Sequence, residues 1–283
     1  MIEIIKAIIL GIVEGITEWL PISSTGHMIL VDEFLRLGMS DAFKELFLVA
    51  IQLGAILAVI VLYWRKLFPV SLFKKNADSE ILNGLRRAET MDVAKLWLKV
   101  IIACVPAAVI GFMFDDKINA HFFNYQTVAA ALIFYGALFL VVERWRKDSA
   151  PRIDDLARMD YKTALIIGLF QTLALIPGTS RSGATILGAM IIGTSRTVAA
   201  EFTFYLAIPV MLGASLLKML KFGLVFSGME VAVLLTGAVT AFIVSVFAIK
   251  FLVSYVKKHD FKIFGWYRIA LGVIVFAYFG LFG

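Results

Sequence analysis

The sequence predicts an all-α integral membrane protein that forms a single domain over residues 1–283. Three observations predict this class. Hydrophobic residues make up 61% of the chain and the mean hydropathy is +0.90, whereas soluble domains are about 45–50% apolar. Six apolar runs are long enough to cross a bilayer, and basic residues gather in alternate connections between them. The net charge of +6 follows this topology, so we expect no nucleic-acid partner.

Six segments have the length of a transmembrane helix, which needs about 20 residues to cross a hydrocarbon core of roughly 30 Å. They lie near residues 46–64, 97–115, 124–142, 199–219, 231–249 and 264–282. Pro106 and Pro209 fall inside two of them, where neighbouring helices can absorb the resulting kinks.

Two further apolar stretches end too early to cross the bilayer. Residues 4–20 stop at Pro21, and residues 164–176 stop at Pro177 and span only about 20 Å as a helix. Each is followed by a polar segment and a short apolar return, at 28–31 and 186–192. This pattern predicts two re-entrant helix–loop–helix segments, which are tolerated only where protein or a wet cavity surrounds the broken backbone.

The distribution of basic residues predicts the orientation. They are concentrated in segments 65–99, 143–162 and 250–268, the last of which ends at Arg268. The alternate connections, 116–123 and 220–230, carry only Lys117 and Lys221. By the positive-inside rule the three basic segments are cytoplasmic. Both chain ends and the mouth of the first re-entrant segment then face the outer side, and the second enters from the cytoplasm.

An internal comparison at an offset of 157 residues relates residues 1–142 to residues 163–283, with a cytoplasmic linker at 143–162. The aligned identities include Ala7 with Ala164, Gly11 with Gly168, Ser23 with Ser180, and Gly26 with Gly183. Both halves also share the order short helix, polar segment, short return and three spans. Because each half crosses the membrane an odd number of times, the sequence predicts an inverted-topology repeat.

The first polar segment, EGITEWLPISSTGH at residues 14–27, holds two carboxylates in apolar surroundings. Glu14 and Glu18 lie four residues apart, hence on one helix face, where two buried like charges repel. A divalent cation, a shared proton or a nearby arginine would offset that cost. Three hydroxyl groups, those of Ser23, Ser24 and Thr25, precede His27 at the start of the return helix.

The second polar segment, PGTSRSGAT at residues 177–185, predicts an anion site. Pro177 and Gly178 end one helix, and Ser180, Arg181 and Ser182 open the next, so backbone N–H groups and a guanidinium face the ligand. With Glu14 and Glu18 across from it, the ligand is expected to be a phosphate ester or diphosphate. Both carboxylates are candidate ligands for Mg²⁺ or Ca²⁺, which prefer hard oxygen donors. The expected substrate-binding residues are Glu14, Ser23, Thr25, Gln171, Gly178, Ser180, Ser182 and Thr185.

On these two motifs, and over its full length, the chain resembles the undecaprenyl-diphosphate phosphatases, the BacA/UppP bacitracin resistance proteins. The resemblance implies hydrolysis of undecaprenyl diphosphate, recycling of the lipid carrier for peptidoglycan synthesis, and bacitracin resistance. It also implies a divalent cation and an active site on the outer side of the bacterial cytoplasmic membrane. The catalytic residues it implies are Glu18, Ser24, His27 and Arg181, with Glu14 assisting.

Several alternatives stay open at this point. The nucleophile is Ser24, activated by His27 (the favoured acceptor) or Glu18, or else it is a metal-bound water. A lipid or anion transporter is a second functional class, because transporters use inverted repeats and broken helices. A type 2 phosphatidic-acid phosphatase is disfavoured, since only His259 follows Ser180-Arg181 and Ser195-Arg196. Glu201 is expected to pair with Arg196 or with another cation, and a homodimer is a candidate assembly.

Overall fold

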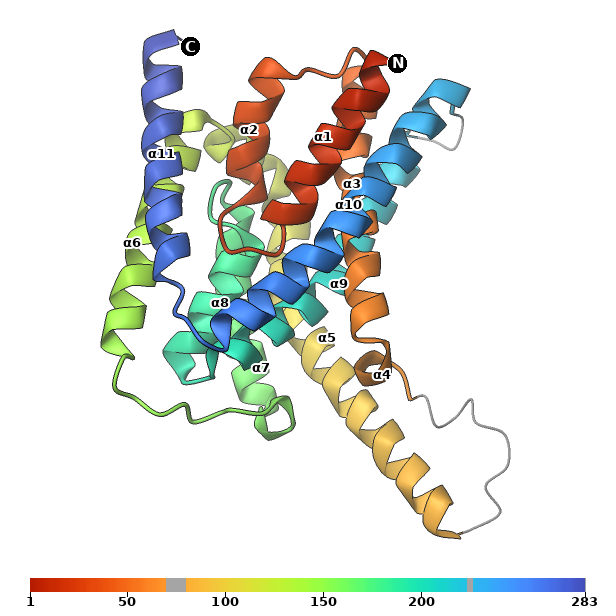
Figure 1. The fold of residues 1–283 in the computed structure, drawn as a ribbon, viewed down its shortest axis with the longest axis vertical. Coiled ribbons are helices and arrows are strands. Elements are labelled where there is room, and N and C mark those ends of the chain that lie inside the picture. The colour runs from red at the N-terminus through yellow and green to blue at the C-terminus, as the bar shows by residue number, and fades with distance from the viewer. Residues whose placement is uncertain (70–79, 223–225, 283) are drawn as a thin grey trace.

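The computed structural model describes residues 1–69, 80–222 and 226–282, and these ranges are almost entirely helical, with no β-strand in them (Figure 1). Six helices are long and apolar enough to cross a membrane, as the sequence predicts for a multi-pass membrane protein. They are α3 (Asp41–Leu62), α5 (Glu80–Phe122), α6 (Tyr125–Trp145), α9 (Arg196–Phe222), α10 (Gly228–Val256) and α11 (Lys262–Phe282).

The long helices run further than their apolar segments. The run predicted at 97–115 belongs to α5, in which the candidate membrane span is Ala88–Phe114. Charged residues at its ends continue the helix because backbone hydrogen bonding requires no apolar side chain. Pro106 and Pro209 lie inside α5 and α9, as expected.

Four shorter helices flank the two polar segments. The first pair is α1 (Ile2–Thr17) and α2 (Ser24–Phe34); the second is α7 (Tyr161–Thr172) and α8 (Arg181–Ile192), with the 3₁₀ turn η3 (Leu173–Leu175) between them. Asp160 caps the start of α7 by accepting from the Thr163 N–H at 2.7 Å. A hydrogen bond from the Thr163 side chain, followed by this backbone bond, lowers the pKa of Asp160.

The helices pack in a crossed arrangement. The helix α1 packs along α10, and α7 packs along α5, while α3 lies against α9 and α6 against α11. Glycine permits two of these contacts: a Cβ at Gly11 would lie 2.6 Å from the Gly237 backbone oxygen, and one at Gly168 would lie 2.2 Å from that of Ala103. Small residues at such positions let membrane helices approach closely.

The two chain ends lie at one end of the molecule in Figure 1, and the basic connections lie at the other. The latter include α4 (Trp64–Leu67), the connection holding η2 (Leu156–Arg158), and the turn from α10 to α11. Lys74 and Lys75, counted in the first basic segment, lie outside the described residues. Arg268 corrects the grouping of 250–268 as one connection, because it is fully buried inside α11.

Two ion pairs stabilise the basic end, the end of the molecule that holds the basic connections. Arg196 binds the buried carboxylate of Glu143 through Nε and Nη2, and the same carboxylate accepts from the Phe261 N–H. Glu201 forms an ion pair with Lys66 at 2.8 Å. Of the two expected partners, Arg196 or another cation, it is therefore another cation that binds Glu201. These contacts join α6, α9, α4 and the turn before α11.

Candidate active site

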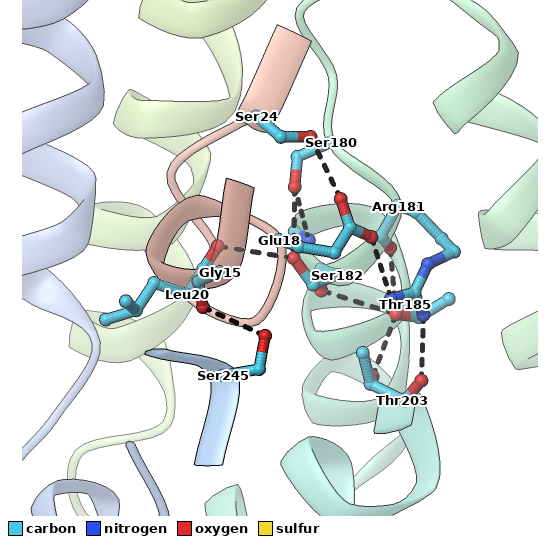
Figure 2. Close-up of polar contacts among 11 residues, drawn as sticks. Gly15, Glu18, Leu20, Ser24, Ser180, Arg181, Ser182, Thr185, Thr203 and Ser245 are labelled. Atoms are coloured by element: carbon cyan, nitrogen blue, oxygen red, sulfur yellow. Dashed lines mark hydrogen bonds and ion pairs between the residues drawn. The ribbon is translucent and has the colours of Figure 1, made fainter. Parts of the chain in front are cut away.

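Two turns from distant parts of the sequence meet in the middle of the molecule. The first lies between α1 and α2 at residues 18–23, and the second lies between η3 and α8 at residues 176–180. The Ser182 hydroxyl donates to the carbonyl oxygen of Leu20 at 3.3 Å, which joins α8 to the first turn (Figure 2). The structure therefore brings together the two polar segments that the sequence singles out.

Each turn ends in a serine that caps the next helix, and both serines have the same strained backbone conformation. Ser23 has φ 74° and Ser180 has φ 72°, and within the described residues they are the only non-glycine positions with positive φ. Each serine side chain accepts from the backbone N–H three residues later, in Gly26 and Gly183 respectively. A non-glycine residue in this region costs about 1–3 kcal/mol and persists only when its surroundings hold it.

Glu18 is the centre of the site. Its side chain is almost fully buried, and Oε2 accepts from the Ser24 hydroxyl at 2.9 Å. Its other oxygen, Oε1, accepts from Nη2 of Arg181 at 3.1 Å (Figure 2). Ser24 and Arg181 are each the first residue of a helix, so the two turns aim them at one carboxylate. The guanidinium supplies the countercharge that this buried acid requires.

Arg181 is itself held in place from several sides. Its Nη1 donates to the Thr203 carbonyl oxygen at 2.8 Å, and its guanidinium carbon lies 6.0 Å from the ring centre of Trp19. The Thr203 hydroxyl lies 2.8 Å from that of Thr185, whose Oγ1 also donates to the Arg181 carbonyl oxygen. A fixed guanidinium with a planar fork is suited to an oxyanion.

Glu14 lies one helical turn before Glu18 and is 2% exposed. Its Oε1 has no hydrogen-bond partner among the described residues, and Gln52 of α3 and Glu18 both interact with its carboxyl group. The described part of the chain contains no cluster of three or more acidic, His or Cys ligands. Mg²⁺, however, is often held by one or two carboxylates and completed by substrate phosphates. The orphaned oxygen beside a second carboxylate fits such a shared cation.

His27 has partners other than Ser24. Its Nδ1 lies 2.7 Å from the Ser23 carbonyl oxygen, and its Nε2 lies 2.7 Å from the Tyr267 hydroxyl. The two rings are stacked with centres 5.5 Å apart. The Ser24 hydroxyl instead binds Glu18. The geometry thus favours Glu18 over His27 as the acceptor of the Ser24 proton. The sequence leaves both acceptors open.

The remaining predicted residues surround this centre. The Ser180 and Ser182 hydroxyls are 3.1 Å apart, and Gly178 has φ 90°. Thr25 lies half-buried in the first turn of α2. Gln171 is buried at the end of α7, where its Nε2 donates to the Ala103 carbonyl oxygen of α5 at 3.5 Å. Gln171 is therefore directed toward α5 rather than toward the Glu18 centre.

Sequence reasoning missed four residues that hold the site: Gln52, Thr203, Tyr267 and Arg268. Arg268 carried the clearest signal, since a charged residue in an apolar span is by default a functional candidate. The distribution of basic residues along the sequence places it instead with the connection before α11. The other three have common residue types, and nothing in their local sequence distinguishes them.

The chain is similar to known proteins over nearly its whole length. Residues 7–274 match the family model described as bacitracin resistance protein BacA. An undecaprenyl-diphosphatase of Desulfitobacterium hafniense is 61% identical over 99% of this chain and 97% of its own length. Undecaprenyl-diphosphatase 1 of Clostridium acetobutylicum is 59% identical over 98% of each chain. An undecaprenyl-diphosphatase of Enterococcus faecalis is 59% identical over 97% of this chain and 96% of its own.

Proposed function

This chain belongs to the BacA family of bacitracin resistance proteins, and from that membership we propose that it hydrolyses undecaprenyl diphosphate to undecaprenyl phosphate and inorganic phosphate. The observation that carries the proposal is the Glu18 carboxylate, bound on one side by a serine hydroxyl and on the other by an arginine. A nucleophile, its proton acceptor and a phosphate-binding group thus share one buried site.

The residues divide the chemistry as follows. Arg181 and the N–H groups at the starts of α2 and α8 bind the terminal phosphate. Ser24 Oγ attacks that phosphorus while Glu18 takes its proton, and the bond to the lipid phosphate oxygen breaks. Undecaprenyl phosphate leaves with that proton, so Glu18 is again a carboxylate. Glu18 then deprotonates a water that attacks the phosphorus, and it returns the proton to Ser24 Oγ as the bond to Ser24 breaks and inorganic phosphate leaves. His27 stays bound to Ser23 and Tyr267 and orients the first turn of α2.

A divalent cation would be held by Glu14 and Glu18, the two candidate metal ligands. When bound, it supplies positive charge that offsets the phosphoryl oxygens. The orphaned Oε1 of Glu14 supports this assignment.

We also propose that the architecture is an inverted repeat with two re-entrant turns. Its support is the crossed packing, in which α1 lies on α10 and α7, its counterpart, lies on α5, the counterpart of α10. Counterparts α3 and α9 also lie together, as do α6 and α11. A two-fold relation produces reciprocal contacts of this kind. The matching φ values of Ser23 and Ser180 add to that support.

The proposed location is the bacterial cytoplasmic membrane, with the basic end in the cytoplasm. The first turn then opens toward the outer side, where hydrolysis would return the lipid carrier to peptidoglycan synthesis. Removing the diphosphate form would also confer bacitracin resistance. The proposed assembly is a homodimer.

Phosphate release by the purified chain in detergent tests the function directly. Undecaprenyl diphosphate with Mg²⁺ or Ca²⁺ should yield stoichiometric inorganic phosphate, and Glu18→Gln and Arg181→Gln should abolish most of it. Arg158→Gln, an exposed arginine paired with Asp154, is the matched control. No release by folded wild-type protein would reject the enzyme and favour transport, which the broken helices would also suit.

A further inference from the structure

Arg268 joins the two turns of the site. It lies in α11 and is completely buried. Its Nη1 donates to the Pro21 carbonyl oxygen at 3.3 Å, and its Nη2 donates to those of Gly178 and Thr179 at 2.9 and 2.7 Å. One guanidinium therefore binds both halves of the site through backbone atoms.

Those carbonyl groups lie just before the strained N-caps. Pro21 precedes Ser23 by two residues, and Thr179 directly precedes Ser180. Positive φ at each serine must be held by neighbouring structure. Arg268 is placed to hold the backbone at both turns. Ser24 and Arg181 directly follow the two serines, so the serine conformations set the directions of these side chains.

The surroundings of Arg268 exclude a simple ion pair. Within the described residues it has no carboxylate partner, and its Nε is unpaired. Its guanidinium carbon lies 5.8 Å from the ring centre of Tyr135. A Cβ at Gly183 would come within 2.7 Å of its Nη1, so a larger residue there would displace the guanidinium. A charge buried at this cost without an acidic partner points to a task beyond stability.

We propose that Arg268 is a positioning residue that fixes the two turns relative to each other, so that Ser24 and Arg181 meet on Glu18. This inference rests on the proposed phosphatase function. Arg268 does not touch the reacting atoms; it acts through the turn backbones. Lysine at this position keeps the charge but cannot bind three carbonyl groups in the geometry of a planar fork.

The test compares Arg268→Lys and Gly183→Ala with Arg158→Lys, which makes the same chemical change at an exposed site. Assays run well below each variant's melting temperature and are normalised to folded protein. Arg268→Lys should lower kcat about 10²-fold, as expected for a misplacement near 1 Å, with KM within about threefold of wild type. Gly183→Ala should lower kcat in the same way by displacing the guanidinium. Unchanged kcat in folded Arg268→Lys would overturn the proposal.

Hydrogen exchange supplies a readout that needs no activity. Amides of residues 20–27 and 177–184 should both exchange faster in Arg268→Lys, while residues 146–158 stay unchanged. Faster exchange in one turn only, or equally across the chain, would contradict a joint role. If wild-type protein releases no phosphate, the proposed function fails, and the exchange pattern alone still decides whether Arg268 joins the turns.

Discussion

Glu18 and Arg181 are 163 residues apart in sequence, yet Oε1 of one lies 3.1 Å from Nη2 of the other. Both side chains are nearly buried, at 7% and 10% exposure. The pair explains how an apolar stretch can hold a carboxylate, because the guanidinium from the other turn balances its charge. It also makes the site composite, since neither half of the chain contains both partners.

Arg181→Lys should keep a positive charge near Glu18. It should lose the planar guanidinium that binds both the Glu18 carboxylate and the Thr203 carbonyl oxygen. We expect phosphate release to fall about 10²–10³-fold, the usual loss when one fixed oxyanion-binding group is removed. Steady-state release assays in detergent measure this. A decrease no larger than that of Arg158→Lys would remove Arg181 from phosphate binding.

Ser24→Ala should stop formation of a covalent intermediate and lower phosphate release by at least 10³-fold, on the order seen for other lost nucleophiles. Ser227→Ala, which changes an exposed helix cap instead, is the matched control. Mass spectrometry of wild-type protein quenched during turnover should find phosphate on Ser24. Activity surviving in Ser24→Ala within tenfold of wild type would assign the attack to water.

His27→Gln distinguishes the two acceptors. Because the Ser24 hydroxyl binds Glu18, we expect His27→Gln to lower activity only about tenfold, well short of the effect of Glu18→Gln. Tyr267→Phe, which removes the hydroxyl beside Nε2, should cause a still smaller loss. An effect of His27→Gln equal to that of Glu18→Gln would return the acceptor role to the histidine.

Glu14→Gln should weaken activation by the cation more than it lowers the maximal rate. One of the two carboxylate ligands becomes neutral, so a higher Mg²⁺ concentration is required for half-maximal release. Chelation with EDTA should abolish release, and added Mg²⁺ or Ca²⁺ should restore it. Full activity in EDTA would exclude a metal-dependent reaction and leave Glu14 with another role.

Glu143→Gln should affect stability without affecting chemistry. The change weakens the bonds from Arg196, worth about 2 kcal/mol for a charged hydrogen-bonded pair, while the amide oxygen can still accept from Phe261. Thermal melting in detergent should show a lower midpoint, with unchanged activity per folded molecule below it. Lost activity without a lower midpoint would tie this end of the molecule to the site.

The sequence predicts the six spans because length and hydropathy are properties of each segment by itself. The same holds for the turns, where Pro21 and Pro177-Gly178 mark the ends of helices. Helix ends were predicted less well, as in α5, since a helix continues through charged residues once it has left the apolar run. The inverted repeat stays a prediction that the packing supports.

Side-chain partners could not be predicted in the same way. His27 is closer to Ser24 in sequence than Glu18 is, yet the strained N-cap at Ser23 turns the hydroxyl toward the acid. The burial of Arg268 is not evident from the sequence, because the number of charges in a segment does not show which face of a helix is buried. Such pairings depend on the relative placement of several helices, which no local pattern encodes.

The most direct test of the composite site is a double-mutant cycle on phosphate release with Glu18→Gln and Arg181→Gln. If the two side chains act as one unit, the double variant should be scarcely slower than the worse single variant. If the two losses multiply, the side chains act independently, and the ion pair across the two turns would not be the centre of the site.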